Sequence, residues 1–369
     1  MTLRTSPTIA RGRPFLAVLA VLALLGACNG NDDAPTTASP EATGPANGQD
    51  EPDEVTEPDE PEPTEEPEPA VDPAEVGANE LGRIPVLMYH RILPDGGGDY
   101  DNTPEEFRDE LRRLHEEGYV PITTAELVSG HIDVPAGTTP VVLTFDDSTR
   151  EQFGLTEDGE VVPDTAVAIM EELAEELDGF EPAGSFYVLR SLFGSSEERG
   201  RELLAELHAR GYEIGNHTAD HDNLGQLDAS GVQRALAEGV ANITAAIPDA
   251  EVRTLSYPLG IRPDDPTLVA EGEHDGITYT HEAGLLVGSG PSPAPFDAEF
   301  DPLAIPRIRS QPDWTPGDEP DYSSGFWLAW FQDNPEQRYV SDGDSDTISF
   351  PEALADQLHP DLVDRARPY

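Results

Sequence analysis

The sequence has no lysine, only one cysteine and little positive charge. All 21 basic residues are arginines, against 74 aspartates and glutamates, so the 369 residues carry a net charge of −53. Such a chain lacks the basic surface that grips nucleic-acid phosphates or anionic lipid headgroups, and we expect no nucleic-acid partner. A single cysteine also excludes an intrachain disulfide and a cysteine-rich zinc site.

Residues 1–28 have the pattern of a targeting segment. Three arginines precede an apolar run over 15–27, which is too short for a comfortable membrane span and is typical of a signal-peptide core. The run ends at Cys28, and small residues before the only cysteine indicate a bacterial lipoprotein signal. We therefore expect Cys28 to carry a lipid that anchors the protein on the extracytoplasmic face of the cell membrane. The alternative is a plain secretory signal that contains a cysteine.

Residues 29–80 contain 17 acidic and no basic residues, with repeated Glu-Pro and Asp-Pro pairs. This segment has little apolar surface to bury and repels itself, so we predict a disordered, acidic, proline-rich tether. From residue 81 the composition becomes globular. We predict one domain over 81–310, followed by an aromatic-rich extension over 311–369 that packs on it.

Short β-like runs alternate with helical patterns in the globular part. The predicted strands are Ile84–Tyr89, Val141–Phe145, Gly184–Leu189, Tyr212–Gly215, Thr254–Tyr257, Gly284–Val287 and Ala304–Ile308. The predicted helices are Pro104–Tyr119, Pro163–Leu177, Glu197–Arg210 and Leu227–Ile247. This alternation predicts an α/β fold with mostly parallel strands, whose chemistry lies at the carboxyl ends of the strands.

Two acid and histidine motifs follow predicted strands. Asp146 and Asp147 end one strand, and adjacent carboxylates repel each other unless a cation or hydrogen bonds compensate. His217 and His221 follow a later strand at a spacing of four, which suits two metal ligands. Taken alone, the acids could be a turn and a helix cap, and the histidine pair could be structural. Together they suggest two imidazoles and one carboxylate on a divalent metal, with the second carboxylate free as a general base.

These motifs resemble those of the polysaccharide deacetylases of carbohydrate esterase family 4, the NodB-homology domain. The resemblance rests on Thr144-Phe145-Asp146-Asp147 and on His217-Thr218-Ala219-Asp220-His221. It implies an irregular (β/α)7-type barrel. It also implies that Asp146 is the general base and that Asp147, His217 and His221 bind the metal, with zinc expected and cobalt or nickel as alternatives.

The third motif departs from the common family pattern. Ser256-Tyr257-Pro258-Leu259-Gly260 has serine where the family usually has the arginine that orients the base. This form, with Pro85-Val86-Leu87-Met88-Tyr89-His90, is more similar to the circularly permuted poly-N-acetylglucosamine deacetylases. That resemblance implies His90 as the general acid. A structural role for His90 is the alternative, and His281 and His359 are weaker candidates for the acid.

Four further residues are candidates for support of the site. Arg150 is a candidate replacement for the missing arginine, and Arg307 is either a structural ion-pair partner or a residue that orients the base. Tyr257 and Leu259 belong to the third motif. Another departure is Ser148, where glycine commonly follows the two aspartates. The aromatic residues of the extension, among them Tyr322, either close the fold or stack on sugars, and a buried cluster is the more common arrangement.

The resemblance implies an enzyme that removes N-acetyl groups from an N-acetylglucosamine-containing polymer, either exopolysaccharide or peptidoglycan. Its partners would be that acetylated polysaccharide and, through the lipid anchor alone, the membrane. One alternative is an O-acetyl esterase on the same fold. Another is a degenerate lipoprotein that binds glycan without turnover, as the serines at 148 and 256 suggest.

Overall fold

The computed structural model describes residues 71–288, 290–312 and 322–369. The predicted signal peptide, Cys28 and residues 29–70 of the predicted tether lie outside the described residues. In the part of the chain that is described, no helix is both long and apolar enough to cross a membrane.

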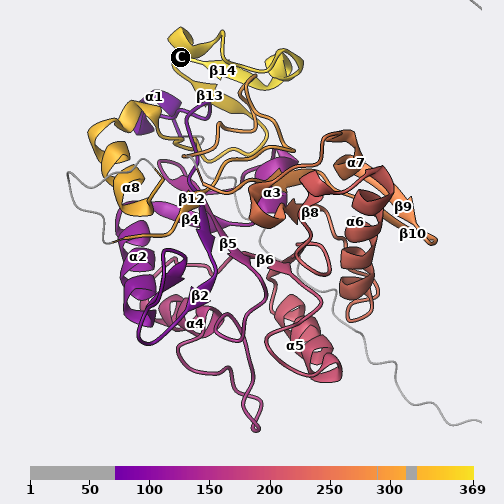
Figure 1. Cartoon of the computed structure of the whole chain (residues 1–369). Coiled ribbons are helices and arrows are strands. Elements are labelled where there is room, and N and C mark those ends of the chain that lie inside the picture. Colours follow the sequence, from indigo (N-terminus) through magenta and orange to yellow (C-terminus); the bar gives the residue numbers. More distant parts are fainter. Residues whose placement is uncertain (1–70, 289, 313–321) are drawn as a thin grey trace, which may run out of the picture. The chain divides into compact units, whose positions relative to one another are not determined.

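A parallel sheet of eight strands forms the centre of the domain (Figure 1). The strand order is β11-β8-β7-β6-β5-β1-β12, and β4 also pairs with β5. All strand pairs in this sheet are parallel. The strands are β1 (Val86–Tyr89), β4 (Tyr119–Ile122), β5 (Thr139–Asp146), β6 (Ser185–Val188), β7 (Glu213–Asn216), β8 (Thr254–Ser256), β11 (Ala283–Leu285) and β12 (Ile308–Arg309).

The segment 305–309 joins the two ends of this sheet. The Ile305 amide donates to the Gly284 carbonyl of β11 at 2.9 Å, whereas Ile308 pairs with Leu87 of β1. The same short segment therefore touches both edge strands and curls the sheet into an irregular barrel. The predicted α/β fold of mostly parallel strands is confirmed.

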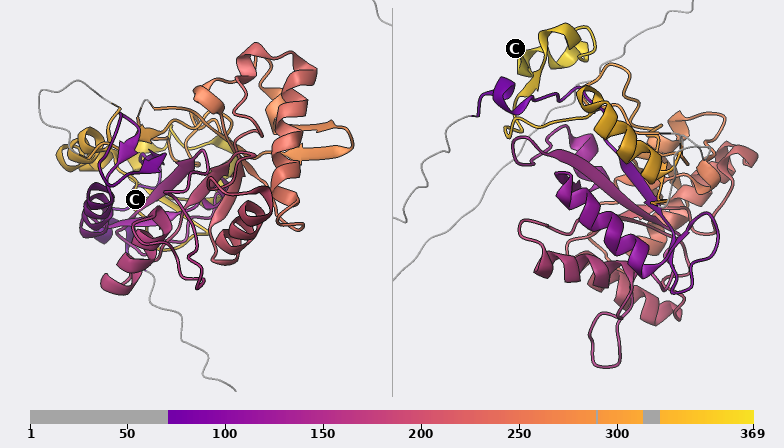
Figure 2. Two further views of the ribbon diagram at one scale, coloured as in Figure 1. Left: turned by 60° about the horizontal axis from the view of Figure 1, so that its bottom comes forward. Right: turned by 90° about the vertical axis from the view of Figure 1, so that its left-hand side faces the viewer.

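Helices cover the outside of the strands (Figure 2). The four long ones around the barrel are α2 (Pro104–Glu116), α4 (Ala166–Glu176), α5 (Glu197–Ala209) and α6 (Ala229–Thr244). Each begins behind a residue whose side chain accepts a hydrogen bond from a backbone amide of the first turn, namely Thr103, Thr165, Ser196 and Asp228. Such caps satisfy amides that have no partner inside the helix and so fix where each helix starts.

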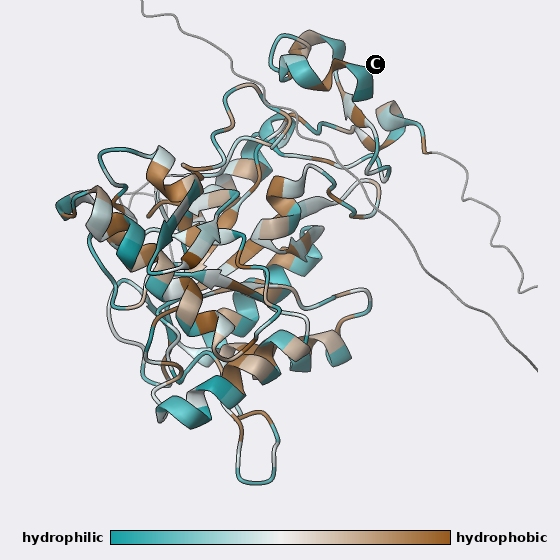
Figure 3. Cartoon of the chain, turned by 90° about the vertical axis from the view of Figure 1, so that its right-hand side faces the viewer, coloured by the Kyte–Doolittle hydropathy of each residue, from teal (hydrophilic) through white to brown (hydrophobic). Residues whose placement is uncertain are grey.

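Alternate residues of each strand face opposite sides of the sheet, so the hydrophobic core consists of an outer cluster beneath the helices and an inner cluster inside the barrel. On β5, Leu143 and Phe145 join the cluster that packs against the outer helices. Val142 joins a second cluster, closed by C-terminal residues such as Phe350. Hydrophobic residues, brown in Figure 3, accordingly concentrate in the strands and on one side of the helices. By the same alternation, Asp146 shares the inward face with Val142.

Smaller elements complete the domain. They are α1 (Pro73–Val76), α3 (Thr124–Ser129), α7 (Thr267–Ala270), α8 (Ser324–Asp333), β2 (Arg91–Ile92), β3 (Asp101–Asn102), β9 (Glu271–His274), β10 (Ile277–Thr280), β13 (Ile348–Phe350) and β14 (Ala366–Pro368). The extension after residue 310 packs on the rest of the domain: Tyr339, for example, is fully buried and its carbonyl accepts a hydrogen bond from Thr139 Oγ1 at 2.6 Å.

The expected end of the tether at residue 80 differs from the structure. Asp72 caps the short helix α1, and Asn79 bridges Val340 of the extension. The Glu80 side chain is only 2% exposed. Acidic composition predicted a solvated segment here, but this carboxyl group has buried donors, so the folded domain includes residues from Asp72 onward.

Burial of Glu80 makes stability depend on pH. Its carboxyl group accepts hydrogen bonds from the Ser349 amide and the Tyr339 hydroxyl, with Asp342 close by. Burial, with the Asp342 charge, raises the pKa of Glu80 from 4.5 to about 7 despite these donors. The folded state therefore holds a proton that the unfolded state has lost between these two pH values. The stability that Glu80 contributes through this proton is complete below pH 4.5 and is lost as the pH rises through 7.

We expect the free energy of unfolding of the wild type to fall between pH 4.5 and 8 by roughly 3 kcal/mol more than that of Glu80→Gln. Glutamine keeps the shape of the side chain and has no charge to bury. Urea unfolding of both proteins at the two pH values measures the difference. If the free energy of unfolding of the two proteins changed equally with pH, the raised pKa of Glu80 would be contradicted.

Candidate active site

Four residues at the carboxyl ends of strands converge on one place with a fifth residue that lies just before β12. His90 follows β1, Asp146 ends β5, His217 follows β7, Ser256 ends β8 and Arg307 precedes β12. His90, Asp146, His217 and Ser256 each lie an even number of residues from an inward-facing residue of the same strand, so the period of two points them to the barrel interior. Arg307 lies two residues after Ile305, which belongs to the inner cluster. The parallel register then brings them to the same edge.

Asp147, His217 and His221 bring three ligand atoms together. One ligand atom from each lies within 4.8 Å of the other two. His217 Nε2 and His221 Nε2 lie 3.5 and 3.7 Å from Asp147 Oδ1. Ligands at about 2.0–2.1 Å around a tetrahedral zinc ion stand about 3.4 Å apart, which is close to the two distances from Asp147, so the three donors suit such an ion.

A backbone contact orients the first of these imidazoles. His217 Nδ1 lies 2.7 Å from the Ser256 carbonyl oxygen. A carbonyl only accepts, so Nδ1 carries a hydrogen, and the Nε2 of the neutral imidazole is free to ligate a cation beside Asp147 and His221. Burial alone would lower the pKa of His217, but the charges of Asp146 and Asp147 outweigh it and raise this pKa. The surroundings therefore favour positive charge at this point, which also suits a cation.

Asp146 is held by a buried arginine. Arg307 Nη1 and Nη2 donate to the two carboxylate oxygens at 2.9 and 2.7 Å, and both side chains are almost completely buried. Arg307 also donates to the Leu286 carbonyl at 2.6 Å and to Thr144 Oγ1 at 3.1 Å. Burial would raise the pKa of Asp146, but the Arg307 charge prevails and lowers it. Arg307 therefore forms a buried ion pair with Asp146, which is compatible with both roles expected for it.

Ser256 takes part in the site at the position where the family usually has arginine. Its hydroxyl donates to Asp146 Oδ2 at 3.1 Å. Its carbonyl accepts from His217, as described above. The serine therefore links the carboxylate to a metal-ligand candidate, and the arginine function comes from a different strand.

The prediction that Arg150 replaces the missing arginine is wrong. Its side chain is 78% exposed, and its Nε lies 3.7 Å from Glu151. The chain turns sharply before it, because Asp147 and Ser148 have φ of 74° and 46°. This turn carries the following residues away from the barrel interior.

The Ser148 side chain stabilises the turn at Asp147 and Ser148 by two hydrogen bonds. Its hydroxyl donates to the Ser191 carbonyl and accepts from the Leu189 amide, both at 3.1 Å. Among the described residues, five of the eight non-glycine positions with positive φ lie in the loops of the site: Asp147, Ser148, Thr218, His221 and Leu259. Positive φ at a non-glycine residue costs free energy, and such residues are concentrated at functional sites, where the backbone fixes the direction of a side chain.

His90 lies on the other side of the Asp146 carboxylate. Its Nε2 is 4.0 Å from Asp146 Oδ2, and its side chain is 19% exposed. Burial lowers the pKa of His90 despite the nearby Asp146 and Asp147 charges. The two weaker candidates are engaged elsewhere: His281 is buried between Val269 and Asn216, and His359 bonds the Asp361 amide.

The two candidate supporting residues of the third motif differ in exposure. Tyr257 is fully buried, and its hydroxyl donates to the Leu303 carbonyl at 2.8 Å. Leu259 is 55% exposed at φ 60° in the short turn after β8. Leu259 is therefore available to a ligand, whereas Tyr257 is a buried residue that packs beneath the surface of the turn.

Gln152 is a site residue that the sequence did not single out. Its Nε2 donates to the carbonyls of His90 and Asp146, at 2.7 and 2.5 Å. It thereby ties the ends of β1 and β5 together. The only signal in the sequence is its position six residues after Asp146, which is a weak one.

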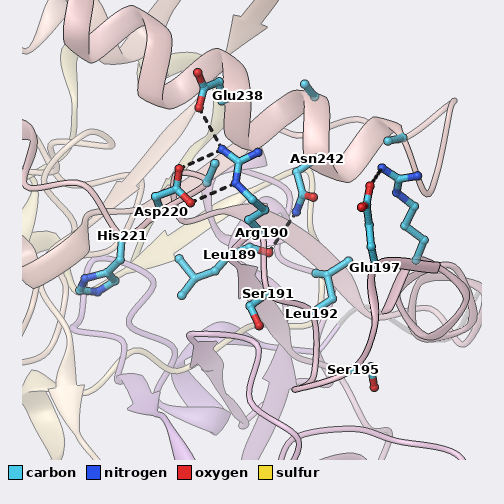
Figure 4. Close-up of a pocket in the computed structure, with 14 residues that line it drawn as sticks. Leu189, Arg190, Ser191, Leu192, Ser195, Glu197, Asp220, His221, Glu238 and Asn242 are labelled. Carbon is cyan, nitrogen blue, oxygen red and sulfur yellow. Dashed lines mark hydrogen bonds and ion pairs between the residues drawn. The ribbon is translucent and has the colours of Figure 1, made fainter. Parts of the chain in front are cut away.

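A pocket of about 690 Å³ adjoins the loop that carries the histidines (Figure 4). His221 lies at its edge, and Arg190 lies between Asp220 and Glu238. Arg190 Nε and Nη2 donate to the two oxygens of Asp220 at 3.0 and 2.9 Å. These contacts hold the histidine loop against helix α6.

Comparison with known proteins finds similarity in part of the chain. Residues 133–279 match the model of the polysaccharide deacetylase family. A chitooligosaccharide deacetylase of Sinorhizobium fredii is 30% identical over 145 residues, which are 39% of this chain and 57% of that protein. This chain thus matches little more than half of that relative's length.

Two solved structures are also similar in part. The Streptococcus pyogenes deacetylase PplD, in complex with acetate, has 19% identity and a TM-score of 0.47 over 63% of this chain and 95% of its own. IcaB from Ammonifex degensii has 21% identity and a TM-score of 0.43 over 63% of this chain and 93% of its own. Residues 133–279 of this chain are thus similar to polysaccharide deacetylases.

Proposed function

We propose that the protein is a metal-dependent deacetylase that removes N-acetyl groups from an N-acetylglucosamine-containing cell-surface polysaccharide, either exopolysaccharide or peptidoglycan. The observation that carries the proposal is the Asp147, His217 and His221 cluster beside the buried Asp146. Residues 133–279 match the model of a family of deacetylases, which are hydrolases. The relative's name supports an acetylated amino sugar as the substrate.

The side chains suit hydrolysis of an amide. A divalent cation at the three ligands, zinc by the donor set, would polarise the acetyl carbonyl and favour ionisation of water. Asp146 accepts the proton of the attacking water, and Arg307 with Ser256 holds its carboxylate in place. The C–N bond breaks, and His90 supplies a proton to the leaving amine. The products are acetate and a free amino sugar.

The two serine departures support turnover over a degenerate binder. Both hydroxyls make hydrogen bonds that build the site, Ser148 within its loop and Ser256 with Asp146. We also propose that the lipid anchor at Cys28 places the enzyme at the extracytoplasmic face of the membrane, where such polymers lie. This part rests on the sequence of residues 1–28 alone.

The test is acetate release from N-acetylglucosamine oligomers by the full chain, first stripped of metal and then supplied with zinc or cobalt. We expect release to be negligible without metal and restored by one equivalent. An O-acetylated xylan serves as the parallel substrate, and faster release from it would favour the esterase alternative. Stoichiometric zinc binding without release from either substrate would contradict the enzymatic proposal.

A further inference from the structure

An exposed tyrosine lies against the candidate general acid. Tyr100 belongs to the loop between β2 and β3, and its ring centroid is 5.0 Å from that of His90, with the ring planes at 60°. Tyr100 is nevertheless 43% exposed. An aromatic surface is therefore available to a ligand directly beside the site.

The loop that carries Tyr100 is held in place. Arg91 Nε and Nη2 donate to the two oxygens of Asp101, both at 2.7 Å. The Gly98 amide donates to Asp101 Oδ2 at 2.7 Å as well. A side chain at Gly97 would collide with that carboxylate, because an added Cβ would lie 2.1 Å from Oδ2. The position of Tyr100 is thus fixed before any ligand binds.

An arginine joins Tyr100 to a second exposed tyrosine. The Arg309 guanidinium carbon is 5.2 Å from the Tyr100 ring centroid and 4.5 Å from that of Tyr322. The Arg309 amide also donates to the Tyr322 carbonyl at 2.9 Å, and its Nη2 donates to Gln311 Oε1 at 2.9 Å. We call Tyr100, Arg309 and Tyr322 the tyrosine platform.

The exposure of the platform sets it apart from the other aromatic residues of the domain. Seven of its tyrosines are at most 4% exposed: Tyr89, Tyr119, Tyr187, Tyr212, Tyr257, Tyr279 and Tyr339. Tyr322 is 39% exposed, and the only other tyrosine of similar exposure in the described residues is Tyr369. Two large rings left in water, stacked on one cation and next to a reactive centre, indicate a binding surface.

A pyranose ring is the ligand that this surface fits. The C–H faces of a sugar pack on an aromatic face, while its hydroxyl groups meet tyrosine hydroxyls, a guanidinium and water. A polyanion is disfavoured because the chain carries a net charge of −53. We propose that the tyrosine platform binds a neutral sugar unit of the same glycan, beside the unit that is deacetylated. This inference rests on the proposed function.

The test compares kcat/KM on N-acetylglucosamine oligomers of two and six units. Tyr322 is the residue to change, since it contacts Arg309, whereas the Tyr100 ring lies against the candidate general acid His90. We expect Tyr322→Ala to lower kcat/KM on the hexamer about tenfold through KM, with a smaller loss on the dimer. Tyr322→Phe keeps the ring and should restore most of the preference. Tyr369 is the control residue, because its exposure is similar to that of Tyr322 and it is not part of the platform. Tyr369→Ala should leave the ratio of kcat/KM on the hexamer to kcat/KM on the dimer at its wild-type value.

A hexamer-to-dimer ratio that stays at the wild-type value in Tyr322→Ala would overturn the platform while leaving deacetylation intact. If the wild type releases no acetate, calorimetric titration with the hexamer decides instead. Weaker binding by Tyr322→Ala than by Tyr322→Phe would then support the platform without the enzyme. Equal affinities would overturn it.

Discussion

Arg307→Met should lower the free energy of unfolding by about 3–5 kcal/mol and remove most of the activity. The reason is that Asp146 is almost completely buried, and Arg307 supplies two of its hydrogen bonds together with the compensating charge. Methionine replaces the aliphatic part of the arginine side chain, but it leaves a carboxylate without a counter-charge inside the barrel. Urea unfolding and acetate release measure the two losses.

Arg307→Lys is the matched control. Lysine keeps the charge but offers a single ammonium group in place of the planar fork that meets both carboxylate oxygens. We expect an intermediate loss of stability and a large loss of activity, because the carboxylate is no longer held in one orientation. Wild-type stability in Arg307→Met would show that the pair is not a buried ion pair in solution.

Asp146→Asn should lower kcat by about 10²- to 10⁴-fold while zinc still binds. The amide cannot accept the proton of the attacking water, whereas Asp147, His217 and His221 remain in place. Zinc binding is followed by calorimetry on the metal-free protein, and turnover by acetate release. Loss of zinc binding in this variant would mean that Asp146 is itself a ligand.

Asp146→Asn also leaves the Arg307 charge buried without its partner, so the single variant mixes two effects. The double variant Asp146→Asn/Arg307→Met separates them. Two neutral side chains remove both buried charges, and we expect stability to recover most of the loss seen in Arg307→Met. Activity should stay low. A double variant that turns over like the wild type would contradict the role of Asp146 as the base.

Much of the barrel was predictable because its strands are short, apolar and separated by amphipathic helices. The run Val141–Phe145 lies inside β5, and the pattern Glu197–Arg210 gives α5 to within one residue. Strand β4 was not predicted. Its sequence Tyr119-Val120-Pro121-Ile122 contains a proline and directly follows a helix, and only its pairing with Thr139–Val142 makes it a strand.

The candidate site was predictable where its residues are adjacent in sequence. Asp146 with Asp147, and His217 with His221, form motifs that local spacing reveals. The partner of Asp146 could not be chosen in this way, because Arg150 is four residues away in sequence and Arg307 is 161. The turn at Asp147 and Ser148 points the near arginine to solvent, while the barrel closure brings the distant one inside. The tyrosine platform likewise joins Tyr100 to Arg309 and Tyr322, which follow it by more than 200 residues in the sequence.

The closure by segment 305–309 has a consequence for the order of folding. The strands β1 and β5 to β8 and the histidine loop all precede this segment in the chain, yet the Asp146 carboxylate finds its counter-charge only when Arg307 docks. Asp146 and Arg307 are 161 residues apart in the sequence, and contacts between such distant residues form late because a long loop must close first. A nascent or truncated chain that ends before residue 305 therefore contains every metal-ligand candidate but leaves an uncompensated charge in an open sheet. We therefore expect the surroundings of Asp146 to be complete only in chains in which segment 305–309 has closed the barrel.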